Sequence, residues 1–98
     1  MNEQGIINAI IEFCSPEKIY VHGRKQNINS GETSACSICV VVKSDDPDEL
    51  ERKMYVEIDS DIYFDLIVYD TDEWNDLIED TQSYAYRISQ KGVLVYAK

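Results

Sequence analysis

The chain has 98 residues, and its 19 acidic and 9 basic side chains give it a formal net charge of −10. This length predicts one compact domain over residues 1–98 and excludes a two-domain protein, while an apolar fraction of 44% excludes an intrinsically disordered chain. No apolar run reaches the roughly 20 residues that a membrane span requires, so we expect a cytoplasmic protein that does not contact a membrane. The acidic balance also argues against direct nucleic acid binding, which depends on lysine and arginine contacts to phosphate.

The acidic side chains are concentrated in one part of the sequence. Residues 45–80 carry 15 acids and two bases, whereas residues 1–44 are neutral and residues 81–98 carry a charge of +3. Two interpretations stay open: solvated helix faces and loops that keep the domain soluble, or a surface for a basic partner.

The first half of the chain predicts one helix and two strands. Apolar residues recur at i, i+3, i+4 and i+7 near the N-terminus, which indicates an amphipathic helix over residues 2–14. Residues 18–22 form a short β-branched and aromatic run that predicts a strand ending at Gly23. The polar residues 24–34 predict a loop, and the apolar run of residues 35–43 predicts a second strand.

A capped helix and a buried strand come next. Asp46, Pro47 and Glu49 occupy the N-cap, N1 and N3 positions of a predicted helix that continues to about Val56. Residues 62–69 are apolar at almost every position, which is typical of a strand covered on both faces.

Two short helices and a terminal segment follow. Thr71 is the predicted N-cap of a helix whose apolar stripe includes Trp74. A further helix is predicted from about Thr81 to a C′ glycine at Gly92, and residues 92–98 predict a terminal strand or an extended tail. The complete order predicts an α+β fold, in which a small mixed sheet of three core strands is flanked by about four helices. If the C-terminal segment forms a strand, it adds a fourth strand to this sheet.

This order of elements resembles the minimal nucleotidyltransferases of the DNA polymerase β superfamily. In that family a glycine-serine pair closes the first strand, a D-x-D motif opens the second, and a further acid lies in the third strand. Here Gly23 matches the glycine and Asp65 matches the third acid, whereas Ala35 and Ser37 stand where the two aspartates of the D-x-D motif would fall. The resemblance covers about residues 4–97 and implies a nucleotidyltransferase-like fold with a degenerate catalytic motif.

The resemblance also implies a lost activity. Nucleotidyl transfer in this family uses two Mg²⁺ ions, which require carboxylate oxygens. With alanine and serine at two of the three positions, we expect no catalytic residue, no metal site and no cofactor, and we interpret Ala35, Ser37 and Asp65 as vestigial positions. The function that the resemblance then favours is a protein-binding or regulatory subunit. The resemblance implies an antitoxin-like subunit, because such domains bind a small helical HEPN-type protein in toxin–antitoxin pairs. The alternative that stays open is a homo-oligomer.

Two alternatives retain Mg²⁺ and a nucleoside triphosphate. A divergent nucleotidyltransferase would use Asp65 together with a nearby acid such as Glu32 or Asp61. A nucleotide-binding protein without catalysis would use the glycine and the basic pair that follows it, because an arginine can hold a phosphate through its fork of donors. These nucleotide-binding candidates are Gly23, Arg24 and Lys25. A solvated loop tip is the competing interpretation of the basic pair.

Asp65 itself has two interpretations. It shares a strand face with Tyr63, Ile67 and Tyr69, which predicts a carboxylate in apolar company. It is either a relic of the family's third acid or a purely structural residue. Two nearby aspartates that imitate a D-x-D motif are out of register and are interpreted as turn residues: Asp59 and Asp61.

The cysteines and the single histidine carry weaker signals. We expect Cys14, Cys36 and Cys39 to be small core residues without a disulfide, and Cys36 and Cys39 to point to opposite faces of one strand. His22 is interpreted as packing at a strand end, and nothing in the spacing brings it to a cysteine as the base of a nucleophile. The late tyrosines predict a surface that could contact a partner: Tyr84, Tyr86 and Tyr96.

Overall fold

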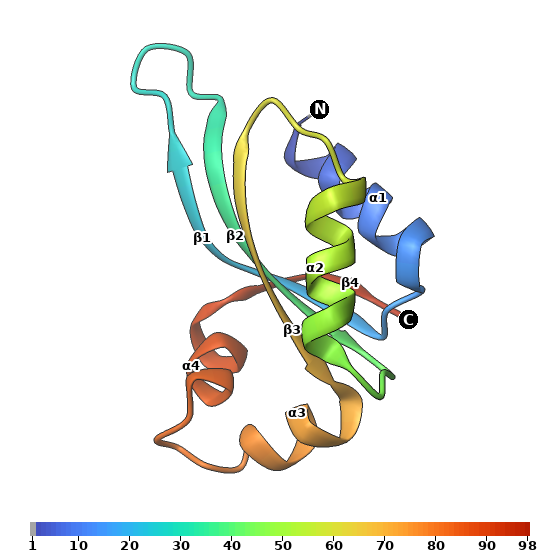
Figure 1. The fold of residues 1–98 in the computed structure, drawn as a ribbon. Helices are drawn as coiled ribbons and strands as arrows, with labels where there is room; N and C mark the ends of the chain where they lie inside the picture. Colours follow the sequence, from blue (N-terminus) through green and yellow to red (C-terminus); the bar gives the residue numbers. More distant parts are fainter. Residues whose placement is uncertain (1) are drawn as a thin grey trace.

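The structure, a computed structural model, describes residues 2–98 as four helices and a four-stranded β-sheet (Figure 1). In chain order the elements are α1 (Glu3–Cys14), β1 (Lys18–Gln26), β2 (Thr33–Val42), α2 (Pro47–Glu57), β3 (Tyr63–Asp70), α3 (Thr71–Leu77), α4 (Tyr84–Lys91) and β4 (Val93–Ala97). The predicted fold class, α+β with a small mixed sheet and four helices, is confirmed. Among residues 2–98, no helix has the length and apolar character that a membrane crossing requires.

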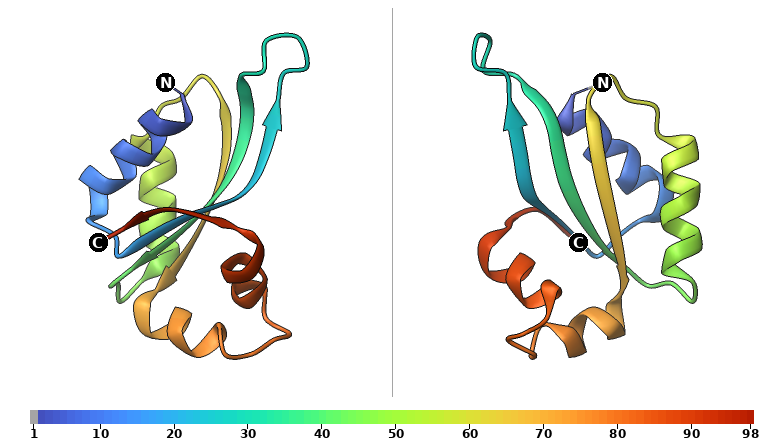
Figure 2. Two further views of the ribbon diagram at one scale, coloured as in Figure 1. Left: turned by 180° about the vertical axis from the view of Figure 1, so that it is seen from behind. Right: turned by 60° about the vertical axis from the view of Figure 1, so that its left-hand side comes forward.

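The sheet has the strand order β3-β2-β1-β4. β1 is antiparallel to both β2 and β4, and β2 is parallel to β3. The C-terminal segment is therefore a strand rather than an extended tail. Because β4 pairs only with Lys18–Val21, the rest of β1 extends beyond it with β2 as a hairpin, which Figure 2 shows projecting from the body of the protein.

The β1–β2 hairpin is longer than predicted. β1 continues past Gly23 and β2 begins at Thr33, so the predicted loop over residues 24–34 was wrong at both ends. A register shift between Val21 and Gly23 leaves His22 in a β-bulge, after which the two strands pair again. Strand pairing uses backbone groups, so a polar sequence can form a ladder that apolar periodicity does not reveal.

Asn27 organises the turn of this hairpin. Its side-chain Oδ1 accepts hydrogen bonds from the backbone N–H groups of Asn29 (2.8 Å) and Ser30 (3.3 Å). Its carbonyl accepts a bond of 2.8 Å from Gly31, whose φ of +75° lies in the left-handed region that favours glycine. The polar side chains in this stretch therefore stabilise a turn rather than a long loop.

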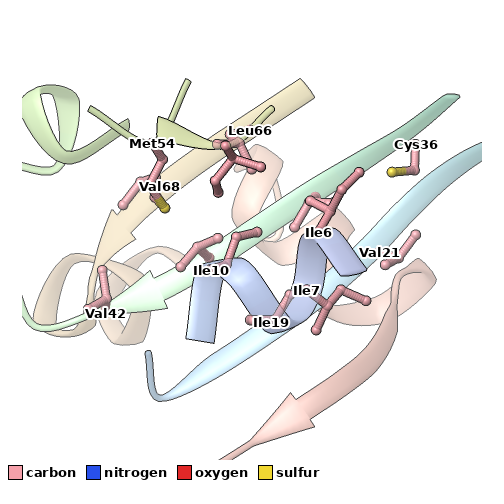
Figure 3. Packing of buried hydrophobic residues seen from close by; sticks show 13 residues of the cluster. Ile6, Ile7, Ile10, Ile19, Val21, Cys36, Val42, Met54, Leu66 and Val68 are labelled. Atoms are coloured by element: carbon pink, nitrogen blue, oxygen red, sulfur yellow. The ribbon is translucent and has the colours of Figure 1, made fainter. Parts of the chain in front are cut away.

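α1 and α2 cover one face of the sheet and form the larger core (Figure 3). The predicted start of α2 is confirmed, because the Asp46 carboxylate accepts a 3.1 Å hydrogen bond from the Glu49 N–H and Pro47 follows the cap. The apolar stripe of α1 points into the sheet as its spacing predicts. The fully buried residues of this core are Ile6, Ile10, Ile19, Ile38, Val40 and Met54.

α2 also covers the outer edge of β3. The Leu66 N–H donates a 2.6 Å hydrogen bond to the Tyr55 hydroxyl, and the Val68 N–H donates to the Glu51 carboxylate. The Tyr55 ring stacks on Phe64 with 5.7 Å between the ring centroids. The backbone groups of an edge strand attract other chains when they are unpaired, so these side chains protect β3 from such pairing.

α3 and α4 cover one end of the opposite face. Trp74 of α3 is buried between Tyr20 of β1 and Tyr69 of β3, with 5.3 Å between its ring centroid and that of each tyrosine. In Figure 2 both helices lie at this end of the sheet, away from the projecting hairpin. The remainder of the face has no helix over it.

The starts of these two helices differ from the prediction. Asp70 rather than Thr71 caps α3, because its carboxylate accepts a 3.1 Å bond from the Asp72 N–H while its own backbone stays extended. α4 begins at Tyr84 instead of Thr81, because the preceding residues form a turn and Ser83 caps the helix. In both cases more than one residue near the helix start can act as a cap, and the sequence does not show which one does.

The predicted C′ glycine has a different role. Gly92 follows α4, but its φ of −75° lies outside the left-handed region. A Cβ at this position would lie 2.6 Å from the backbone oxygen of Ile88, so glycine is required here by close approach of the backbone.

Candidate functional site

Two rows of residues lie on the part of the sheet face that α3 and α4 leave uncovered. Each row crosses β1, β2 and β3, because residues that are partners in the sheet register point to the same face. The first row consists of Lys25, Ala35 and Tyr63, and the second of Gly23, Ser37 and Asp65. The next residue of β2 on this face, Cys39, is already buried beneath the helices.

The three positions matched to the catalytic carboxylates of the resembled family lie together in these rows. Ala35 and Ser37 alternate along β2, and Asp65 is the register partner of Ser37 on β3. With Gly23 and Tyr63 they line an open hollow of about 460 Å³. This hollow is therefore the candidate site for binding a ligand.

Asp65 shares its strand face with Tyr63, Ile67 and Tyr69 as predicted, but its side chain is exposed rather than buried among them. Tyr69 on the same strand face is buried against Trp74, and Ile67 is partly buried. Tyr84 at the start of α4 lines a hollow with Asp65, but the helices leave the Asp65 side chain exposed. Sequence alternation identified the face correctly but could not show where its cover stops.

The predicted basic pair is divided between the two faces of the sheet. Arg24 is the register partner of Cys36, which is buried beneath α1, and its Nε lies 2.8 Å and 3.2 Å from the two carboxylate oxygens of Glu3. Lys25 is exposed on the open face beside Ala35. Both residues line the hollow, but the Arg24 guanidinium is held by the Glu3 carboxylate, so Lys25 is the residue of the pair whose charge is placed to meet a ligand there.

His22 adds a polar group that the sequence interpretation did not connect with this face. Its ring packs edge-on against Tyr84 of α4 with 5.9 Å between centroids, and its Nδ1 lies 3.4 Å from the Tyr84 hydroxyl. Burial lowers the pKa of His22, and the nearby negative charge of Asp65 opposes that shift. His22 and Tyr84 are 62 residues apart in the chain, and no pattern in the sequence links them.

The donor set of the open face does not fit the two Mg²⁺ ions of the resembled family. Asp65 is the one carboxylate among the residues that line the 460 Å³ hollow, and its register partner Ser37 offers a neutral hydroxyl. Two Mg²⁺ ions need several carboxylate oxygens to replace lost water. Within residues 2–98 there is also no group of three or more His, Cys, Asp or Glu side chains arranged to hold a metal ion.

The acids proposed for a divergent enzyme lie in pairs at two different hollows. Asp61 shares one hollow with Asp65 at the start of β3 and a different one with Glu32 near the start of α1. Glu32 and Asp65 line no hollow in common among those found in the described chain. The three carboxylates therefore do not converge on a single site.

The cysteines occupy the positions predicted for them. Cys36 lies in the core under α1 and Cys39 in the core under α3 and α4, so they point to opposite faces, and all three cysteines are free thiols. Burial raises the pKa of Cys39 to about 12 and that of Cys14 to about 11, which keeps both protonated and poorly nucleophilic. Cys36 and His22 contact different helices and do not form a nucleophile and base.

The late tyrosines do not form one surface. Tyr84 is 49% exposed beside His22, whereas Tyr96 packs against the core under α1 on the other face. Tyr63, which the sequence did not single out, is 68% exposed at the hollow. Two exposed tyrosines thus lie near Asp65.

No protein-family model, curated protein or solved structure matches this chain.

Proposed function

We propose that this protein is a nucleotidyltransferase-like domain that no longer transfers nucleotides and acts as a protein-binding or regulatory subunit, antitoxin-like in character. The observation that carries the proposal is the row Gly23, Ser37 and Asp65 on the open sheet face. It sets one carboxylate beside a serine hydroxyl and a glycine. In the resembled family the positions of Ser37 and Asp65 carry carboxylate ligands of a two-metal site, whereas in this row Asp65 is the one carboxylate.

Several features of the same face support a role in protein contact. The rows are uncovered, and two exposed tyrosines stand near Asp65: Tyr63 and Tyr84. Tyrosine is enriched at protein interfaces because its ring buries apolar area while its hydroxyl keeps a hydrogen bond. The charge of −13 over residues 45–80 would attract a basic partner by long-range electrostatics. A small helical HEPN-type protein is the partner that the family resemblance favours, and the location that we propose is the cytoplasm.

Purification of the chain at its native level, followed by size-exclusion chromatography and mass spectrometry, tests this proposal. We expect a stoichiometric complex with a different protein, which dissociates at high salt because charge contributes to the association. Recovery of the chain as a monomer or as a self-association alone would contradict it.

A nucleotide-binding function has less support from the geometry. Lys25 is the single basic side chain of the predicted pair on the open face, since Arg24 is bound to Glu3 behind the sheet. One exposed lysine provides little affinity for a triphosphate without a metal ion or a second cation.

A further inference from the structure

A small hollow of about 160 Å³ lies where α4 meets the open part of the sheet. It differs from the larger hollow in having a helix as one wall. Its lining residues are His22, Ser37, Asp65, Leu66, Ile67 and Tyr84. The chemistry of this lining is specific enough to suggest what it binds.

The walls combine one negative charge with apolar and aromatic surface. Asp65 places an exposed carboxylate at the hollow, and Tyr84 presents a half-exposed ring opposite the partly buried Ile67. A carboxylate beside apolar surface suits a cation that is carried on an apolar stem, which describes the side chains of lysine and arginine. An aromatic ring at the same site adds a cation–π contact, and arginine makes this contact more often than lysine.

His22 lines the same hollow and packs against Tyr84. Its Nε2 is buried and has no hydrogen-bond partner among the described residues, while its Nδ1 faces the Tyr84 hydroxyl. A ligand in the hollow does not reach this buried nitrogen, so the contribution of His22 to the site is to hold the Tyr84 ring edge-on.

These groups together favour a guanidinium over an ammonium. A guanidinium has five N–H donors in one plane, so it can form a forked pair of hydrogen bonds with the Asp65 carboxylate. Its flat face can lie against the Tyr84 ring. The ammonium of lysine offers three donors on one atom and does not stack in this way.

The surroundings leave room for the chain that would carry this side chain. Asp65 lines the small hollow, the 460 Å³ hollow on the open face and a further hollow of about 500 Å³ at the start of β3. A polypeptide segment could therefore continue in either direction from an arginine seated at Asp65. The negative charge of residues 45–80 would draw a basic segment toward this part of the surface.

We propose that the hollow between His22, Asp65 and Tyr84 is the docking site for an arginine side chain of a partner protein. This inference rests on the protein-binding function proposed above and names the chemistry that the partner presents. The partner segment inserts its guanidinium against Asp65 and packs its methylene stem on Ile67.

Titration of the full chain with a five-residue peptide that has a central arginine between glycines and blocked ends tests the proposal. The amide signals of His22, Ser37, Asp65 and Tyr84 would be followed by nuclear magnetic resonance. We expect saturable shifts at these residues, and a citrulline peptide of the same shape but without charge should bind at least about tenfold more weakly. A lysine peptide should lie between the two.

Matched variants define the site. Asp65→Asn should weaken binding of the arginine peptide about tenfold, whereas Asp59→Asn removes an equal charge from another exposed aspartate and should leave the affinity unchanged. Tyr84→Leu, which removes the ring, should also weaken binding. All three variants lie at exposed residues, and the dispersion of the amide spectrum verifies that they fold.

Three results would overturn the inference: equal affinity for the arginine and citrulline peptides, equal losses from Asp65→Asn and Asp59→Asn, or free arginine that binds as tightly as the peptide. The last would indicate a small-molecule site rather than a docking site. These outcomes would leave the proposed protein-binding function standing, whereas the absence of any co-purifying protein would refute that function itself.

Discussion

The hydroxyl of Tyr55 offers a sharp test of how this small sheet is stabilised. It accepts a hydrogen bond of 2.6 Å from the Leu66 N–H and lies 3.4 Å from the Leu66 carbonyl oxygen, at the outer edge of β3. Tyr55→Phe removes the oxygen but keeps the ring that stacks on Phe64. The substitution therefore isolates the contact that protects the strand edge.

The expected loss of folding free energy follows from the Leu66 N–H, which Tyr55→Phe leaves without a hydrogen-bond partner. Leu66 is 6% exposed, so its N–H would lose its partner at a position with little access to water. An unsatisfied group of this kind costs about 1–2 kcal/mol, which corresponds to a fall in Tm of about 5–10 °C for a domain of this size. Chemical denaturation and calorimetry would measure the two quantities, and hydrogen exchange at the Leu66 amide should accelerate.

Tyr63→Phe is the matched control, because it removes the hydroxyl of a tyrosine that is 68% exposed and lies on β3, the strand that contains Leu66. We expect that variant to be as stable as the unsubstituted protein. If Tyr55→Phe and Tyr63→Phe have the same free energy of unfolding, the hydroxyl of Tyr55 does not stabilise the edge and the reasoning fails.

Three further predictions concern pH, backbone packing and charge. Burial lowers the pKa of His22 in the folded protein below its usual 6.5. The unfolded chain therefore binds a proton more readily than the folded protein, so the free energy of unfolding falls as the pH drops through about 6.5. His22→Gln should make unfolding less dependent on pH between about 8 and 5.5. Gly92→Ala should lower the free energy of unfolding by roughly 1–3 kcal/mol in urea, because the added Cβ would meet the Ile88 carbonyl; an unchanged midpoint would refute the close contact. Arg24→Gln breaks a partly exposed ion pair with Glu3 and should cost at most about 1 kcal/mol, with a smaller loss at high salt.

The helices were predictable because their signals are local. The spacing of isoleucines in α1 and the cap at Asp46 depend on neighbours within one or two turns, and both match the structure. The hairpin was not predictable in the same way, since β1 continues beyond Gly23 through backbone pairing across a bulge. Strand length in polar sequence depends on the partner strand, which the sequence does not identify.

The sequence predicted which residues of the candidate site share a face of the sheet, but not how exposed they are or what they contact. Alternation along β2 correctly placed Ala35 and Ser37 on one face, and Asp65 lies beside Ser37 in the sheet. The exposure of Asp65 and the division of the basic pair depend on which end of each face the helices cover. The contact between His22 and Tyr84 depends on how α4 packs after the chain has closed, so no local pattern predicts it.

Binding of Mg²⁺ and nucleoside triphosphate, measured by titration calorimetry, tests the central claim most directly. The unsubstituted protein should show no binding at millimolar ligand, whereas the double variant Ala35→Asp, Ser37→Asp should gain Mg²⁺-dependent binding, because it adds two carboxylates to the face of β2 that lies beside Asp65. Saturable binding of Mg²⁺ and a triphosphate by the unsubstituted protein would contradict the account, since it would mean that the open face has kept the ligands of a nucleotide site.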